Sequence, residues 1–192
     1  LLVKNNLHQH SLTSVMHTNS EGIHFADHQF TNPDFALDYI NSLSEINNNE
    51  LSSTVSAEYD YEDFVRTKIS VVLETVFDSS RIHLTEKTLR PIACGHPFII
   101  AGGPGSLEYI RSYGFKTFNH LWSEDYDNEV HDEQRYEKLA FTLKALDVLP
   151  VEEKQRIFNE AREVCEHNYN HFYGGGFEAV LWQEMQDMLN EF

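Results

Sequence analysis

The hydrophobic pattern between residues 69 and 118 alternates between short apolar runs and amphipathic stretches. The β-branched run "ISVVLETVF" at 69–77 predicts a strand that is buried on both faces. Two further apolar runs, "PFIIAG" at 97–102 and "FKTF" at 115–118, predict a second strand and a short third one. Because a helical stretch separates each strand from the next, the order predicts a parallel sheet with crossover connections.

Two helices are expected between these strands. In the first, "TEKTLRPIACG" at 85–95, Thr85 stands at the N-cap position and Gly95 at the C-terminal stop. Pro91 removes an intrahelical hydrogen bond, which predicts a kink or a short helix. The second helix is expected over "GSLEYIRSYG" at 105–114.

The C-terminal part of the chain is helical by its pattern. A polar loop is expected over 119–132, followed by helices over 132–148, 150–173 and 177–192, with Pro150 near the first turn of the second of them. The predicted fold class is therefore α/β, with a Rossmann-like parallel sheet followed by C-terminal helices.

The N-terminal part differs in composition. Residues 1–60 are polar, rich in Asn, Ser and His, and weakly periodic; 32–43 predicts one helix, and 44–58 predicts a loop or linker. We expect 1–60 to be a weakly structured segment or the remnant of a preceding domain. The main domain is expected over 61–192, beginning with a short helix or approach segment at 61–68.

Composition narrows the class of protein. At 41% hydrophobic and 12% aromatic residues, the chain of 192 residues has the composition of a folded globular protein, and no apolar run approaches the length of a membrane span. The chain starts without Met and without a signal-peptide layout, so we expect a piece of a longer protein. Cys94 and Cys165 are expected to be free buried thiols, which favours a reducing, cytoplasmic location.

Charge is unevenly distributed along the chain. The net charge of −17 argues against non-specific binding to nucleic acid or anionic membranes. Residues 66–116 nevertheless carry +3 and the remainder −20, which favours a small anionic ligand over a polyanion; chance clustering of exposed side chains is the alternative. The basic residues of this segment are Arg66, Lys68, Arg81, Lys87, Arg90, Arg111 and Lys116.

The pair Glu86–Lys87 is the first candidate for chemistry. A helix that starts directly after a parallel strand presents free N–H groups at the sheet edge where open α/β sheets bind ligands. Lys87 would add a mobile charge for a phosphate, and Glu86 would accept hydrogen bonds from ribose hydroxyls. The alternative is that Glu86 only stabilises the helix N-terminus, by about 0.3–1 kcal/mol, and that Lys87 is a solvated surface residue.

Other motifs are weaker. "GGPGS" at 102–106 is glycine-rich like a phosphate cradle but matches neither the P-loop nor the dinucleotide fingerprint, so a plain turn is favoured. The six carboxylates of 122–133 lack EF-hand spacing and predict a solvated acidic loop. Four histidines suggest a metal site but lack the framing of known zinc motifs, so no metal is expected; they are His8, His10, His24 and His28.

Residues 64–102, "FVRTKISVVLETVFDSSRIHLTEKTLRPIACGHPFIIAG", are similar to the donor-binding core of α-1,3-fucosyltransferases and related GT-B glycosyltransferases. In that family an aromatic-flanked Lys leads into a strand ending in Phe-Glu-Asn, and a loop, Thr-Glu-Lys, a helix and a Gly-x-x-Pro segment follow. The matching positions here are Lys68, Glu74–Thr75, Thr85–Glu86–Lys87, Gly95, Pro97 and Gly102.

The chain also resembles a group of glycosyltransferase-like viral and bacterial proteins. They carry T-E-K-T, P-F-I, G-x-P-G-x-L and G-F-K-T-F in this order, followed by an acidic E-x-Y-D, which is Glu124–Asp127 here. Together the two resemblances cover about 60 residues.

The resemblance implies an inverting glycosyltransferase that takes a sugar from a nucleoside-diphosphate donor to an unidentified acceptor and needs no other cofactor. It implies that Glu86 binds the ribose, that Lys87 binds the diphosphate, and that Thr75 lines the nucleotide pocket where the family has Asn. The residues expected to bind the nucleotide sugar are Glu74, Thr75, Thr85, Glu86, Lys87 and Arg66.

The chain departs from the family in its length, which has room for one Rossmann-like domain where GT-B enzymes have two. The family's catalytic carboxylate comes from the other domain, so the catalytic residues are unknown, and Glu74 is a poor candidate base because it ends a buried strand. Two alternatives stay open: a non-catalytic α/β module that binds a nucleotide or a protein, and a metal-dependent hydrolase built on the N-terminal histidines.

Overall fold

The computed structural model describes residues 5–13 and 59–190. The chain divides into two compact units, Leu1–Tyr59 and Asp60–Phe192. The described part of the first unit contains a short 3-10 helix, η1, at Leu7–His10.

Several expectations fall on residues that the structure does not describe. The helix expected over 32–43, the linker expected over 44–58, and His24 and His28 all lie outside the described residues.

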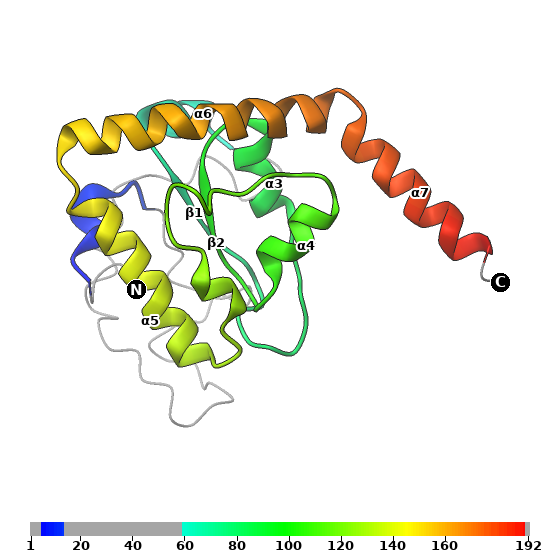
Figure 1. Ribbon diagram of the computed structural model, residues 1–192, viewed down its shortest axis with the longest axis horizontal. Helices are drawn as coiled ribbons and strands as arrows, with labels where there is room; N and C mark the ends of the chain where they lie inside the picture. Colours follow the sequence, from blue (N-terminus) through cyan, green and yellow to red (C-terminus); the bar gives the residue numbers. More distant parts are fainter. Residues whose placement is uncertain (1–4, 14–58, 191–192) are drawn as a thin grey trace, which may run out of the picture. The chain divides into compact units, whose positions relative to one another are not determined.

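In the second unit, two strands form a parallel pair at the centre of a mostly helical arrangement (Figure 1). Strand β1, Ser70–Leu73, pairs with β2, Phe98–Ala101, and helix α3, Glu86–Ala93, connects them. The unit is therefore mixed α/β, as predicted. Its other elements are α2 (Tyr61–Arg66), α4 (Ser106–Ser112), η4 (Asp125–Asn128), α5 (Asp132–Asp147), α6 (Val151–Tyr173) and α7 (Gly176–Asn190).

The two strands differ in burial. All four residues of β2 are buried, as its continuous apolar run predicts. The strand expected over 69–77 is shorter, and its predicted burial on both faces is wrong, because β1 pairs only with β2 among the described strands. Ser70 and Val71 are half-buried, Val72 is 6% exposed, and Leu73 on the opposite side of the strand is 61% exposed.

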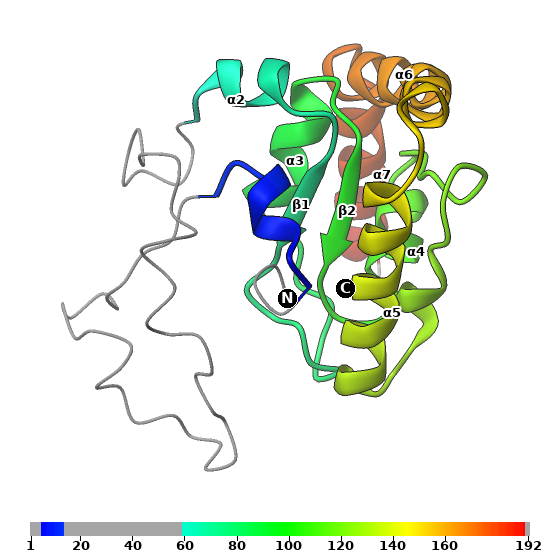
Figure 2. The same ribbon diagram turned by 90° about the vertical axis from the view of Figure 1, so that its left-hand side faces the viewer.

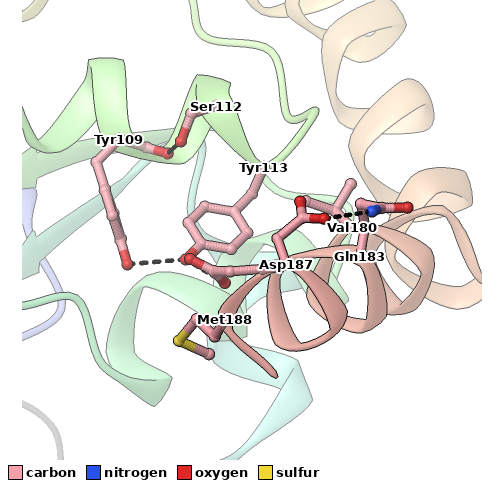
Figure 3. Close-up of a pocket in the computed structure, with 8 residues that line it drawn as sticks. Tyr109, Ser112, Tyr113, Val180, Gln183, Asp187 and Met188 are labelled. Carbon is pink, nitrogen blue, oxygen red and sulfur yellow. Dashed lines mark hydrogen bonds between the residues drawn. The ribbon is translucent and has the colours of Figure 1, made fainter. Parts of the chain in front are cut away.

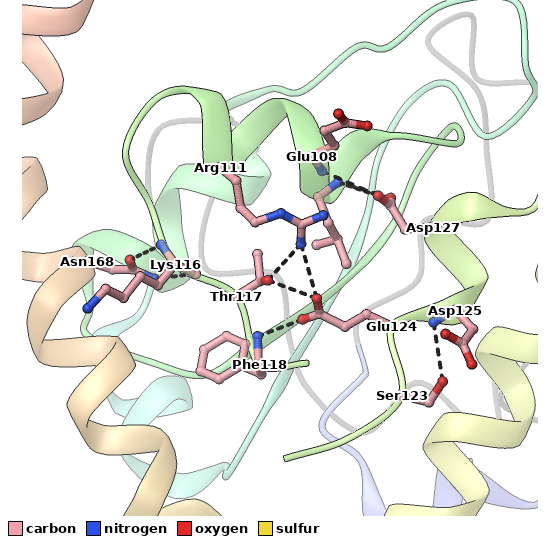
Figure 4. A network of polar contacts seen from close by, with 11 residues as sticks. Glu108, Arg111, Lys116, Thr117, Phe118, Ser123, Glu124, Asp125, Asp127 and Asn168 are labelled. Atoms are coloured by element: carbon pink, nitrogen blue, oxygen red, sulfur yellow. Dashed lines mark hydrogen bonds and ion pairs between the residues drawn. The ribbon is translucent and has the colours of Figure 1, made fainter. Parts of the chain in front are cut away.

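The third strand expected over 115–118 does not form among the described residues. The side-chain amide of Asn168 takes the place of a neighbouring strand: its Oδ1 accepts from the Lys116 N–H at 2.7 Å, and its Nδ2 donates to the Lys116 carbonyl at 2.9 Å. The Phe118 N–H is likewise bound by a side chain, Glu124 Oε1 at 2.6 Å (Figure 4). Side chains therefore satisfy the backbone groups that a sheet ladder would use.

The helices were predicted more accurately than the strands. The three C-terminal helices, α5, α6 and α7, begin and end within two residues of the predicted limits. Helix α6 packs against α3 and α7 and passes the amino ends of the strands, whereas the loops that follow β1 and β2 lie at the opposite end (Figures 1 and 2). Helix α6 thus leaves the carboxyl ends of the strands to those loops.

Replacing Asn168 with Ala is expected to destabilise the protein by about 2 kcal/mol or more, because the buried Asn168 amide is lost and the N–H and carbonyl of Lys116 lose their partners. Urea unfolding followed by circular dichroism measures this loss. The control is Asn159→Ala, at an exposed position of the same helix, and it should change stability by less than about 0.5 kcal/mol. Equal effects of the two substitutions would contradict the role assigned to Asn168.

Candidate functional site

Glu74 marks the point where β1 ends and the candidate site begins. Its N–H donates to the Ala101 carbonyl at 3.0 Å, which continues the strand pairing by one residue. Its side chain is buried and turns toward the start of α3.

Both oxygens of the Glu74 carboxylate bind the first turn of α3. Oε1 accepts from the Thr85 N–H at 3.0 Å and from the Thr88 hydroxyl at 2.6 Å, and Oε2 accepts from the Thr85 hydroxyl at 2.7 Å. These bonds fix the helix start against the end of the strand. Glu74 therefore positions the site, and its oxygens are not free for a ligand or for general-base chemistry.

The pKa of Glu74 reflects this environment. Burial by itself raises the pKa, but hydrogen bonds from Thr88 and Thr85, together with the nearby charge of Lys87, outweigh it and hold the pKa of Glu74 below its ordinary value. The carboxylate is thus ionised at neutral pH, and its charge strengthens the bonds that hold α3.

Thr85 is the N-cap of α3, as predicted, and its hydroxyl accepts from the Lys87 N–H at 3.3 Å. The helix ends at Ala93, two residues after Pro91, and Gly95 follows with φ of +60°, so the short helix predicted from Pro91 is confirmed. The cap and the stop are the local signals that the sequence carried.

The Lys87 ammonium lies over the loop that follows β1. Its Nζ donates to Thr75 Oγ1 at 3.2 Å and to Thr85 Oγ1 at 3.3 Å, and it lies 3.9 Å from the Glu86 carboxylate. The side chains of Lys87 and Glu86 are 39% and 41% exposed. The cation therefore has a fixed position and remains open to an anion from solvent.

Five of the six predicted site residues meet at this place, and Arg66 does not. Arg66 ends α2, which precedes β1, so it lies at the amino end of the strand whereas Glu74 lies at the carboxyl end (Figure 2). Four strand residues, about 13 Å of chain, separate the two ends. The five residues that converge are Glu74, Thr75, Thr85, Glu86 and Lys87.

The loop after β2 touches the loop after β1, and glycine makes this contact possible. A Cβ at Gly103 would lie 2.9 Å from the Asp78 carbonyl oxygen and 3.1 Å from the Arg81 carbonyl oxygen. Such distances exclude any side chain without movement of the backbone, so the two loops pack at the edge of the sheet through Gly103.

The glycine-rich turn at 102–106 is closed to a phosphate by the protein itself. Both oxygens of the buried Asp127 carboxylate accept from the Leu107 N–H at 3.0 Å, and one accepts from the Glu108 N–H at 3.4 Å (Figure 4). Asp127 thus fills the place at the start of α4 that an anion would take. The turn is a plain entry into a helix, which was the favoured interpretation.

The expectation of a fully solvated acidic loop is wrong for two of its carboxylates, Glu124 and Asp127. Glu124 accepts from the Phe118 N–H, from the Thr117 hydroxyl at 2.8 Å and from Arg111 at 3.2 Å. Burial raises the pKa of both carboxyls above the ordinary value, against the opposing effect of their N–H donors. These residues organise the fold, and in the sequence only the E-x-Y-D element of the second resemblance, Glu124–Asp127, set them apart from their exposed neighbours.

Arg135 is a further residue that the sequence did not single out. This side chain of α5 is 1% exposed and donates to the Glu129 carbonyl at 2.7 Å, to the Phe77 carbonyl and to the Asp132 carboxylate at 2.9 Å. Its guanidinium carbon also lies 4.4 Å from the centre of the Phe77 ring. Arg135 therefore holds the loop after β1, which carries Thr75, against α5.

Neither a metal centre nor a membrane helix is found in the described part of the chain. Within residues 5–13 and 59–190, no group of three His, Cys, Asp or Glu side chains is placed to hold a metal ion. His8 and His10 lie in η1. Among the same residues, no helix combines the length and apolar character that crossing a membrane requires.

Comparisons with protein-family models, with curated proteins and with solved structures give no match for this chain.

Replacing Glu74 with Gln is expected to destabilise the protein by about 1–3 kcal/mol at pH 7, because the amide group faces the donors of Thr85 and Thr88. The folded pKa of Glu74 is depressed, so the stabilisation by its charge is complete above the unfolded value of 4.5 and is lost as pH falls through the folded pKa. The stability difference from the wild type should therefore be constant between pH 6 and 8 and shrink in acid, as measured by urea unfolding. A difference that grows in acid, or one that Glu137→Gln on the exposed face of α5 reproduces, would contradict this role.

Proposed function

We propose that this chain binds a nucleoside-diphosphate sugar at the start of α3, as the donor-binding half of a GT-B-like inverting glycosyltransferase. The observation that carries the proposal is the convergence of residues 74–75 with residues 85–87. The family resemblance assigns both segments to donor binding, and hydrogen bonds between Lys87 and Thr75, and between Glu74 and Thr85, join them.

The chemistry of these groups suits a diphosphate attached to a ribose. Lys87 offers an ammonium in a fixed place beside the N-terminal turn of α3, where the helix dipole also favours negative charge. In glycosyl transfer the leaving group is a nucleoside diphosphate, so a cation at this place stabilises the charge that develops as the bond to the sugar breaks. Glu86, half-exposed beside Lys87, is placed to accept hydrogen bonds from ribose hydroxyls.

The position in the fold supports the same ligand. The site lies at the carboxyl ends of the parallel strands β1 and β2, the edge at which open α/β sheets of the Rossmann type bind nucleotides. Of the two helix starts at this edge, that of α4 is closed by Asp127, whereas at α3 the side chains of Lys87 and Glu86 remain half-exposed and can meet a phosphate and a ribose. Residues 66–116 carry a net charge of +3, so this segment attracts an anion more strongly than the acidic remainder of the chain does.

The second candidate is a module of the same type that binds the nucleotide without catalysing transfer. The observation in its favour is that Glu74, the buried carboxylate of the site, has both oxygens bound by α3 and so cannot act as a base. In this case the base would come from another domain or be absent.

Calorimetric titration with a GDP-sugar and a UDP-sugar tests the proposal. We expect one of the two to bind with a millimolar or lower dissociation constant. Lys87→Ala should weaken binding about 10-fold or more, because a hydrogen bond between charged groups contributes about 1.5–3 kcal/mol. Lys144→Ala, at an exposed position of α5, makes the same change of net charge and should leave binding unchanged.

No binding of either donor up to millimolar concentration would remove the proposal. Equal weakening by Lys87→Ala and Lys144→Ala would show that only the overall charge attracts the nucleotide. Donor binding without any turnover by a longer form of the protein would favour the non-catalytic module.

A further inference from the structure

Helix α7 is attached to the rest of the unit mainly at its first turn. The Phe177 ring packs against the rings of Tyr113, Phe115 and Phe172, with centroid distances between 5.1 and 6.0 Å. Beyond that turn the helix projects from the body of the unit (Figure 1), and every residue from 181 to 190 is exposed. Most of α7 is thus available to another molecule.

The exposed part of α7 carries an apolar stripe. Its large side chains recur at spacings of three residues (182, 185, 188) and four residues (181, 185, 189), which places them on one side of the helix, and they are 38–67% exposed. A face of this kind on a surface helix is typical of an interaction site, and methionine in it adapts to the shape of a partner. The stripe consists of Leu181, Trp182, Met185, Met188 and Leu189.

A cavity of about 440 Å³ lies beside this stripe, between α4 and α7 (Figure 3). Two tyrosines form the wall of the cavity opposite α7, Tyr109 within α4 and Tyr113 directly after it: their rings are 5.0 Å apart, and their hydroxyls are 2.9 Å apart. Tyr113 donates its proton to Glu184 at 3.0 Å, so Tyr109 donates to Tyr113. Met188 belongs both to the cavity and to the stripe, so the two surfaces are continuous.

The cavity is negatively charged and lacks a cation of its own. Glu184 accepts from Tyr113, and Asp187 accepts from the Gln183 amide at 2.8 Å, both neutral donors. Within the described residues, neither carboxylate takes part in an ion pair. The sequence from 172 to 192 contains four acidic residues and no Lys, Arg or His. Electron-rich ring faces and unpaired carboxylates together form a site for an organic cation.

We propose that α7 and the α4–α7 cavity bind a basic amphipathic helix of a partner protein. Apolar side chains of the partner cover the stripe from Leu181 to Leu189, and a Lys or Arg side chain enters the cavity between the tyrosines and the carboxylates of Glu184 and Asp187. This surface shares no residue with the site at the start of α3, so the proposal of a partner helix does not depend on the proposed function.

Charge selects this occupant over two others. A second copy of the chain would bring α7 against an equally acidic α7, and the like charges would repel. An anionic membrane would be repelled in the same way, since interfacial helices that bind such membranes are basic. A partner helix with an apolar stripe flanked by Lys or Arg matches both features of the surface.

Fluorescence of Trp182 reports directly on the stripe, because the only other tryptophan, Trp122, is buried. The probe is a Leu/Lys amphipathic peptide of about five helical turns, titrated into the whole chain at physiological salt. Two control peptides are used. One has the same pattern with Glu in place of Lys, and the other has the composition of the Leu/Lys peptide in scrambled order. We expect saturable binding and a blue shift of Trp182 emission with the Leu/Lys peptide alone.

Two matched double variants test the cavity. The double variant Glu184→Gln with Asp187→Asn should weaken binding of the Leu/Lys peptide about 10-fold or more. The control, Glu163→Gln with Glu166→Gln at exposed positions of α6, removes the same charge and should have little effect on peptide binding. Circular dichroism confirms that each variant is folded.

Three results would overturn the proposal. The first is equal binding of the Lys and Glu peptides, or of the ordered and scrambled ones. The second is equal weakening by the two double variants, which would indicate attraction to net charge alone. The third is a blue shift of Trp182 with zwitterionic lipid vesicles, or with rising protein concentration, in the absence of peptide binding, which would assign the stripe to a membrane or to a second copy.

Discussion

The bond network between the Glu74 carboxylate and the first turn of α3 is the constraint on which the candidate site depends. It places a charged group in a buried position, and three donors on Thr85 and Thr88 compensate for the loss of water. Because these donors belong to the N-terminal turn of α3, the helix can start only where the strand ends. The place of Lys87 follows from the place of that turn.

At this edge of the sheet, a carboxylate binds the start of a helix at two places, and only one of the two helix starts stays accessible to a ligand. At α3 the carboxylate binds the helix from the strand side, and Lys87 and Glu86 remain half-exposed. At α4 the Asp127 carboxylate binds the N–H groups of the first turn themselves, and no room is left for an external anion. One helix start is therefore a candidate binding site, while the other joins η4 to α4 as part of the fold.

Local signals in the sequence predicted the helices, and distant contacts explain most of what was missed. The Thr85 cap and the Gly95 stop act within a few residues, so their effect was readable along the chain. Asn168 lies 52 residues from the backbone that it satisfies, so the apolar run at 115–118 looked like a strand. The convergence of Thr75 and Lys87 followed from the family resemblance and from sheet topology. Arg66 was expected in the same site, although its place before β1 puts it at the other end of the strand.

The most direct measurement of the central claim is a nucleotide titration followed by amide resonances in ¹⁵N-labelled protein. GDP and UDP are the probes, since they carry the diphosphate and ribose that Lys87 and Glu86 are proposed to bind. We expect saturable shifts concentrated at Thr75 and at residues 85–88, with small changes elsewhere. Saturable shifts confined to other parts of the chain, such as the α4–α7 cavity, or no shifts at millimolar nucleotide, would contradict it.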